Sequence, residues 1–157
     1  MPRIVMATPE DLPKILDLFR ESVIQSGVEH YTSAQLAAWS SSADNLPRWQ
    51  QKVQEDQFLL ALEGTQLQGF ASLKSPDYLD LMYVAPTSQR LGVASSLLAA
   101  IEDRAKKHGI TVLKSDVSRV ARPFFEHKGF CIVKAQQVER KGEWLENFRM
   151  EKTLKLT

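Results

Sequence analysis

The sequence predicts a mixed α/β (α+β) fold, and three observations support this class. Short runs of bulky apolar residues, typical of buried strands, recur along the chain, most clearly at residues 79–84. Other segments, most clearly residues 91–105, repeat apolar residues every three or four positions, as one face of a helix does. The 157 residues are 43% hydrophobic and 25% charged, which suits a globular domain with a real core. We therefore expect a single domain over residues 1–157.

The first predicted elements are a strand at residues 3–7 and a helix that starts near Thr8. Thr8 suits the N-cap, Pro9 suits the first helical position, and two acidic residues follow in the first turn. Apolar residues then recur at helical spacing: Leu12, Ile15, Leu16 and Phe19. This pattern indicates an amphipathic helix with one buried face.

A second helical region is predicted over residues 27–49, with Thr32 or Ser33 as its cap. Three residues in and beside it are four positions apart and can share one side of a helix: Tyr31, Gln35 and Trp39. Aromatic residues at this spacing often pack in a core. Core packing of Tyr31 and Trp39, with His30 solvated, therefore stays open beside a role in substrate binding.

The middle of the chain predicts a hairpin followed by a central strand. Residues 57–62 and 67–73 read as two strands, joined by a turn that contains Gly64. The strand at residues 79–84 comes next and ends at Pro86, which cannot donate a ladder hydrogen bond. The sequence thus predicts three consecutive strands before the long helix.

The second half of the chain predicts a strand, a short helix and a final hairpin. After the long helix ends at a glycine, residues 110–117 read as a strand. A short helix is expected over residues 118–128, and Pro123 fits best within its first turn. Residues 131–139 and 144–154 read as two strands around a turn that contains a glycine.

The turn between the strand at residues 79–84 and the following helix predicts an anion-binding site. The free N–H groups of a first helical turn point outward, and the helix dipole adds partial positive charge there. Gly92 has no side chain and Ala94 a minimal one, so an anion can approach the backbone closely. Gln89 and Arg90 are expected to supply donors at the rim. The turn lacks the Gly-Lys-(Ser/Thr) of a P-loop and the three glycines of a dinucleotide fingerprint.

Two motifs and the order of elements resemble one known family. The pattern Gln-Arg-Leu-Gly-Val-Ala at residues 89–94 resembles the (Gln/Arg)-x-x-Gly-x-(Gly/Ala) pyrophosphate loop of the GNAT acetyltransferases. Residues 124–130, Phe-Phe-Glu-His-Lys-Gly-Phe, resemble the (Leu/Phe)-Tyr-Glu-x-x-Gly-Phe segment near the end of that fold. The resemblance implies a mostly antiparallel sheet of six to seven strands. In GNAT folds this sheet is splayed between the fourth and fifth strands and flanked by about four helices.

The resemblance also implies acetyl-CoA as the donor. Its pyrophosphate would bind the amides of six consecutive residues: Arg90, Leu91, Gly92, Val93, Ala94 and Ser95. The pantetheine arm carries two amides, which can pair with a strand edge beside Met82, Tyr83 and Val84. Ser118 stands where a CoA-contacting asparagine is common in the family. Phe125 is expected to contact CoA as well. It stands where many members have a tyrosine credited with protonating the departing thiolate, and phenylalanine has no proton to give.

Asp80 is the candidate general base. Aspartate is disfavoured inside a strand, and strand alternation places Tyr78, Asp80 and Met82 on one face, toward the expected cleft. A base is required because an amine acceptor is mostly protonated at neutral pH. Tyr83 is expected to face the other way and to contribute only its backbone. Pairing of Asp80 with a neighbouring basic group, or its exposure to water, stays open.

In GNAT proteins the segment after the first helix commonly lines the acceptor cleft. The resemblance therefore implies that His30 and Tyr31 contact the substrate, together with Tyr78 beside Asp80. Tyr31 is also the candidate replacement for the missing tyrosine as proton donor. A thiol with a pKa near ~8.5 is a tolerable leaving group, so departure without a protein acid stays open.

The expected function is N-acetyltransfer from acetyl-CoA to a primary amine of a small molecule, peptide or protein. An acyl-CoA-binding sensor or interaction module with little catalysis is the alternative, and Phe125 favours it. O-acetyltransfer also stays open, because the residues that bind acetyl-CoA do not determine whether an amine or a hydroxyl attacks it. No metal is expected to take part.

The composition narrows the partners and the location. Twenty basic and nineteen acidic residues leave a net charge of +1, which favours neither nucleic acid nor an acidic membrane. The single Cys131 excludes an internal disulfide. The chain has no signal-peptide pattern and no run of ~20 apolar residues, so we expect a soluble, cytoplasmic protein. A homodimer is compatible with the resemblance, because GNAT proteins often pair through sheet edges.

Overall fold

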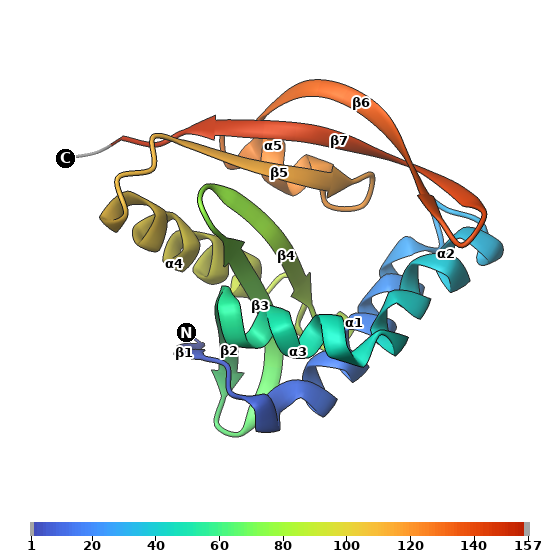
Figure 1. The fold of residues 1–157 in the computed structure, drawn as a ribbon, viewed down its shortest axis with the longest axis horizontal. Coiled ribbons are helices and arrows are strands. Elements are labelled where there is room, and N and C mark those ends of the chain that lie inside the picture. Colours follow the sequence, from blue (N-terminus) through green and yellow to red (C-terminus); the bar gives the residue numbers. More distant parts are fainter. Residues whose placement is uncertain (1, 156–157) are drawn as a thin grey trace.

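Seven strands and five α-helices form the part of the chain that the computed structural model describes, residues 2–155 (Figure 1). In chain order they are β1 (Arg3–Met6), α1 (Leu12–Gly27), α2 (Ser33–Ser40), α3 (Leu46–Glu55), β2 (Gln57–Glu63), β3 (Gln66–Lys74), β4 (Tyr78–Val84), α4 (Val93–Lys107), β5 (Val112–Ser118), α5 (Arg122–His127), β6 (Cys131–Arg140) and β7 (Glu143–Thr153). The predicted mixed α/β class is confirmed, with one helix more than expected. No helix among residues 2–155 is both long and apolar enough to cross a bilayer.

The first helix begins through a short 3-10 turn, Pro9–Asp11, rather than directly after Thr8. Thr8 still fixes the start, because its backbone N–H donates to the Asp11 carboxylate at 2.8 Å. The helix then buries the predicted apolar face, with Ile15 completely enclosed. The sequence therefore located this helix correctly and missed only the geometry of its first turn.

The second helical region divides into two helices instead of one. Thr32 caps α2, with its side chain accepting from the Gln35 N–H at 3.1 Å, so the first of the two proposed caps is correct. A new start signal follows, because Asn45 accepts from the Arg48 N–H at 3.3 Å and Pro47 lies in the first turn. The second helix, α3, consequently continues to Glu55, beyond the predicted end at residue 49.

The sheet has the order β1-β2-β3-β4-β5-β7-β6, and every neighbouring pair except β4 and β5 is antiparallel. The parallel pair is short: it joins only Tyr78 to Lys114 and Leu79 to Ser115. Beyond these residues β4 and β5 separate, and β5 pairs with β7 along its length. The predicted splay between the fourth and fifth strands is therefore confirmed.

A bulge at Asp80 changes which side chains share a face of β4. Ser72 of β3 lies opposite Leu81, whereas the next residue of β3 lies opposite Leu79, so Asp80 is an extra residue in the ladder. The prediction that Met82 shares a face with Asp80 is wrong, because simple alternation fails at a bulge. Met82 packs on the α4 side of the sheet, and Tyr83 packs on the α1 side.

Each face of the sheet carries its own hydrophobic core. One core packs α4 and α5 against the sheet and includes Leu97, Ile101 and Phe125. The other packs α1, α2 and α3 against the opposite face and includes Phe19 and Trp49. The helices are therefore divided between the two faces, and the open edge of β4 lies between the two cores.

Candidate active site

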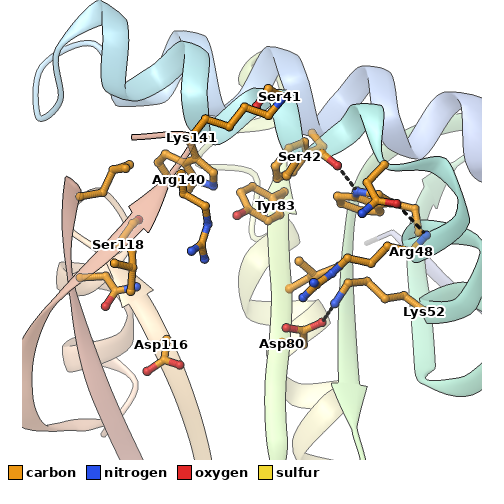
Figure 2. Close-up of a pocket in the computed structure, with 18 of the residues that line it drawn as sticks. Ser41, Ser42, Arg48, Lys52, Asp80, Tyr83, Asp116, Ser118, Arg140 and Lys141 are labelled. Carbon is orange, nitrogen blue, oxygen red and sulfur yellow. Dashed lines mark hydrogen bonds and ion pairs between the residues drawn. The ribbon is translucent and has the colours of Figure 1, made fainter. Parts of the chain in front are cut away.

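A cavity of about 720 Å³ opens on the α1 side of the splay (Figure 2). Residues of the three N-terminal helices and of the turn between α2 and α3 form one wall, and residues of β4, β5, β6 and β7 form the other. Much of the lining is apolar or aromatic: Phe19, Trp39, Trp49, Leu81, Val138 and Leu145. This volume lies within the range of small-molecule sites, ~300–1,000 Å³.

Asp80 lies in this cavity and forms an ion pair with Lys52 of α3 (Figure 2). Both side chains are largely enclosed, with 16% of Asp80 and 12% of Lys52 exposed. The pairing with a neighbouring basic group, which the sequence left open, is thus what the structure contains. The pair uses Oδ2 of Asp80, and Oδ1 has no hydrogen-bond partner among residues 2–155. Asp80 therefore keeps one oxygen free to meet a ligand.

Asp116 of β5 is another carboxylate in the cavity, and each of its two oxygens already accepts two hydrogen bonds. Its Oδ1 accepts from Gln136 at 2.6 Å and from Arg149 at 2.7 Å. Its Oδ2 accepts from the Tyr78 hydroxyl at 2.6 Å and from Arg149 at 3.1 Å. Burial alone would raise the pKa of Asp116, but these donors outweigh it and lower the pKa. Asp116 therefore stays ionised and positions Tyr78. Asp80, in contrast, is an enclosed carboxylate with one oxygen that accepts no hydrogen bond among residues 2–155.

Tyr83 also directs its side chain into the cavity, contrary to the predicted alternation (Figure 2). Its ring meets Phe19 edge-on, with ring centroids 4.9 Å apart. Burial raises the pKa of Tyr83, so the hydroxyl stays protonated at neutral pH and can donate a hydrogen bond. From the sequence, only the backbone of this residue was expected to contribute to the site.

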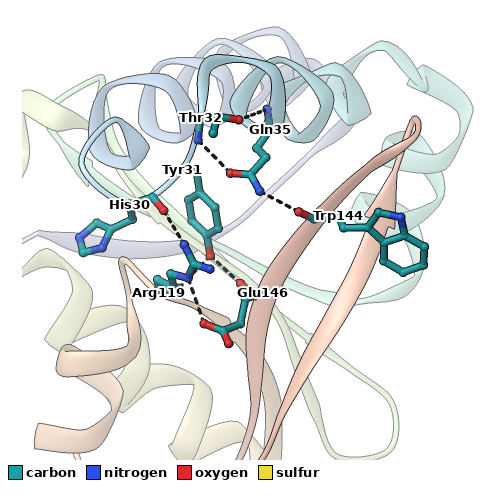
Figure 3. A network of polar contacts seen from close by, with 7 residues as sticks. All are labelled: His30, Tyr31, Thr32, Gln35, Arg119, Trp144 and Glu146. Carbon is teal, nitrogen blue, oxygen red and sulfur yellow. Dashed lines mark hydrogen bonds and ion pairs between the residues drawn. The ribbon is translucent and has the colours of Figure 1, made fainter.

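Tyr31 is held by backbone groups on both sides (Figure 3). Its hydroxyl donates to the Glu146 carbonyl at 2.7 Å and accepts from the Arg119 N–H at 3.0 Å. The ring is 7% exposed and packs edge-on against Trp39, with centroids 5.6 Å apart. Tyr31 therefore joins the start of α2 to β7, and its proton is already engaged.

His30 does not line the cavity. It is exposed, its carbonyl accepts from the Arg119 guanidinium at 2.7 Å, and its imidazole points away from the neighbouring network (Figure 3). The predicted contact between His30 and substrate therefore has no support from this geometry. The solvated alternative for this residue agrees with the structure.

A Tyr31→Phe variant separates the two roles considered for this hydroxyl. A structural role predicts a loss of about 1–2 kcal/mol in the free energy of unfolding, because two partly buried backbone groups lose their partner. It also predicts little change in kcat for acetyl transfer. Urea unfolding and steady-state kinetics on the same preparation measure both quantities. A hundredfold fall in kcat with unchanged stability would instead make Tyr31 the proton donor.

The predicted anion site is built as a backbone turn at the start of α4. Gly92 has φ +78°, and a Cβ placed on it would meet no atom within 4 Å. The first helical bond runs from the Ser96 N–H to the Gly92 carbonyl at 3.0 Å, so the N–H groups of residues 93–95 lack an intrahelical acceptor. Arg90 is exposed beside the turn. The amide of Gln89, expected at the rim, instead donates to the Val84 carbonyl at 3.1 Å.

The open edge of β4 presents backbone groups toward the splay. A Cβ on Gly69 of β3 would lie 2.9 Å from the Tyr83 carbonyl, so the peptide groups of Tyr83 face β3. Backbone groups alternate along a strand, and those of Met82 and Val84 therefore face the open edge. Of their two N–H groups, that of Met82 is nearer to Asp80 along β4, and it is therefore the candidate donor to a developing oxyanion.

Ser118 and Phe125 differ in their relation to the site. Ser118 ends β5 and lines the cavity, and its hydroxyl accepts from the Ala121 N–H at 3.2 Å. Phe125 is 4% exposed and packs edge-on against Phe130, with ring centroids 5.0 Å apart. At this position the chain has a core residue, and its predicted contact with CoA stays a prediction.

Several residues of the cavity were not predicted from the sequence: Arg48, Lys52, Asp116, Arg140 and Asn147. A usable signal existed for Asp116, which, like Asp80, is an aspartate inside an apolar strand. For Lys52 the signal was the spacing of Leu46, Trp49 and Val53, which extends the helix past residue 49. Arg140 lies at the end of a hairpin strand, where sequence alone gives no direction for the side chain.

Comparisons with known proteins agree with this geometry. A family model described as an acetyltransferase (GNAT) domain matches residues 28–154. The Escherichia coli K12 protein named uncharacterized N-acetyltransferase YafP is 34% identical over 142 residues, covering 90% of this chain and 89% of that protein. A GCN5-related N-acetyltransferase from Rhodopseudomonas palustris has a TM-score of 0.96 at 32% identity, covering 98% of this chain and 96% of that chain.

A more distant structure has the same fold. The PaiA N-acetyltransferase of Thermoplasma acidophilum, solved in complex with coenzyme A, has a TM-score of 0.80 at 23% identity and covers 98% of this chain and 99% of that chain. The splayed sheet, the glycine turn before α4 and the match over residues 28–154 lead to one conclusion. The chain belongs to the GNAT acetyltransferase family.

Proposed function

We propose that the protein transfers the acetyl group of acetyl-CoA to a primary amine of a small molecule or peptide. One observation carries this proposal: the gap between β4 and β5 has a glycine turn with free helix N–H groups on one side and an aspartate-containing cavity on the other. A donor and an acceptor bound on these two sides would meet at the open edge of β4. The relatives in the same family support the reaction class.

The donor side fits the phosphates of a CoA molecule. The N–H groups of residues 93–95 and the exposed Arg90 provide donors and positive charge, and nothing fills the space beside Gly92. The open edge of β4 can pair with the two amides of a pantetheine arm. Acetyl-CoA supplies a reactive thioester. Residues of this chain would then supply the base, the oxyanion donor and the donor to the leaving group.

On the acceptor side, Oδ1 of Asp80 takes a proton from the incoming ammonium group, which frees the amine lone pair. The Met82 N–H stabilises the oxyanion that develops on the acyl carbon as the C–N bond forms. The Tyr83 hydroxyl donates a hydrogen bond to the departing thiolate sulfur as the C–S bond breaks. The second proton of the adduct nitrogen passes to this thiolate, which gives the amide and free CoA thiol. Together these three groups cover the base, the oxyanion donor and the leaving group without a tyrosine at position 125.

The first test is calorimetric titration with acetyl-CoA of the wild type, Gly92→Glu and Gly92→Gln. Both variants share the backbone strain at φ +78° and a similar bulk, so their difference isolates the charge. We expect micromolar binding by the wild type and at least about tenfold weaker binding by Gly92→Glu than by Gly92→Gln, because a carboxylate repels the phosphates. Equal affinities of the two variants would show that the phosphates do not bind at this turn.

Release of free CoA thiol in the presence of amines then tests the transfer itself. An acyl-CoA sensor is the second candidate function, and the buried Phe125 without a hydroxyl favours it. Tight donor binding with no amine-dependent release, across amines of different charge and length, would support the sensor. Saturable release that depends on an amine would support the transferase.

A further inference from the structure

The cavity carries an excess of positive charge that its own acidic residues do not neutralise. Each acidic residue of the lining has a basic partner: Asp44 pairs with Arg20, Asp80 with Lys52 and Asp116 with Arg149. Three further cations line the cavity without a carboxylate within 4.0 Å among residues 2–155: Arg48, Arg140 and Lys141. The acceptor therefore meets a net positive surface.

Two of these cations approach the cavity from separate parts of the fold (Figure 2). Arg48 extends from α3, one helical turn before Lys52, so the two side chains share a face of the helix. Arg140 extends from the end of β6, on the opposite side of Tyr83 (Figure 2). Two like charges around one cavity favour an anion between them.

The fold holds both arginines in place. Asn45 caps the helix that carries Arg48, accepting from its N–H at 3.3 Å. Arg140 pairs in register with Glu143 across the β6–β7 turn. The same hairpin is tied to α2, because the Gln35 amide donates to the Trp144 carbonyl at 2.7 Å (Figure 3). These contacts fix the two backbones. Both arginines are exposed, and Nη1 of Arg140 donates to the neighbouring Glu139 carbonyl at 3.0 Å, which leaves its other N–H groups for a ligand.

We propose that the acceptor is a small amine that also carries an anionic group, a carboxylate or a phosphate, bound by Arg48 and Arg140. This inference rests on the proposed function and adds the acceptor class. Guanidinium groups bind both anions through paired N–H donors. Arg48 lies one turn from Lys52 on α3, and Lys52 is the partner of Asp80, so an anion at Arg48 and an amine at Asp80 would occupy the same cavity.

The test compares matched ligands: para-aminomethylbenzoate, the corresponding phosphonate and the neutral carboxamide, with ε-aminocaproate and its carboxamide as a flexible pair. Binding is measured by calorimetry with CoA present, and transfer by acetyl-CoA-dependent release of thiol. We expect an anionic member of a set to bind at least about tenfold more tightly than its amide, and this preference to fall as salt rises. The carboxylate and phosphonate arms distinguish the two anions.

Variants locate the anion. Arg48→Gln and Arg140→Gln are each expected to reduce the preference for the anion about five- to tenfold while affinity for the amide stays constant. Lys134→Gln is the matched control, because this cation lies on β6 outside the cavity. Equal binding of anion and amide, binding of neither, or a preference that survives both arginine changes would overturn the inference. Selective anion binding without thiol release would overturn the transfer and retain the anion subsite.

Discussion

Replacing Asp80 with asparagine is expected to lower kcat for acetyl transfer by about 100- to 1,000-fold, the usual contribution of a general base. Asp80 is the enclosed carboxylate of the cavity with an oxygen free for an ammonium group. The donors around Asp116 occupy both of its oxygens, and Asp44, the third acid of the lining, is 67% exposed. Asparagine keeps the shape and the hydrogen-bonding oxygen but cannot take a proton. The measurement is thiol release under saturating acetyl-CoA and amine.

An unfolded variant would also be inactive, so the free energy of unfolding has to be measured together with activity. Lys52 is 12% exposed and loses its counterion in Asp80→Asn. Removing one partner of an enclosed pair is destabilising, by up to about 3–5 kcal/mol. The double variant Lys52→Gln/Asp80→Asn removes both charges and is expected to regain part of this stability. If Asp80 is the base, the double variant stays inactive although its stability improves.

The pH dependence gives a second, independent readout. Without a base, transfer depends on the small fraction of acceptor that is already a neutral amine. The rate of Asp80→Asn is therefore expected to rise about tenfold per pH unit between pH 6 and 9, approaching the wild type at high pH. A uniform decrease at every pH would show that Asp80 only positions Lys52, and it would remove Asp80 from the catalytic machinery.

The elements predicted correctly are those whose signals are local. Strands β2, β3 and β4 and helix α4 carry their periodicity and their stop residues within a few positions, and their bounds agree with the prediction within a few residues. The bulge at Asp80 depends instead on pairing with Ser72 of another strand. No pattern within β4 contains that register, which is why Tyr83 was assigned to the wrong face.

The same distinction between local and distant signals applies to the candidate site. Tyr78 and Asp80 line the cavity as their shared strand suggested, and Tyr31 lines it as the family resemblance implied. The partner of Asp80 comes from α3, and the partners of Asp116 come from β6 and β7. Such partners are set by packing between distant segments, so a single sequence predicts the isolated residue but not the pair.

Replacing Asp116 is expected to destabilise the fold while leaving the candidate base Asp80 in place. Asp116→Asn keeps the size of the side chain but leaves the Arg149 guanidinium without its counterion and disturbs the bonds from Tyr78 and Gln136. The expected loss in the free energy of unfolding at pH 7 is about 2–4 kcal/mol, less than for a fully buried pair because 34% of Arg149 is exposed. Asp103→Asn, an exposed acid on α4, is the matched control and should change stability by less than about 0.5 kcal/mol.

The sign of the pH dependence follows from the lowered pKa of Asp116. The folded state keeps this carboxyl ionised at pH values where the unfolded chain, with a pKa near ~3.9, already binds a proton. Its contribution is therefore complete above about pH 5 and is lost as the pH falls below about 4 through the folded pKa. The difference in stability between wild type and Asp116→Asn should be constant from pH 5 to 8 and shrink under acid, while other carboxyl groups cancel in the comparison. A difference that stays constant down to about pH 2 would mean that packing around Tyr78, and not the charge on Asp116, stabilises this wall of the cavity.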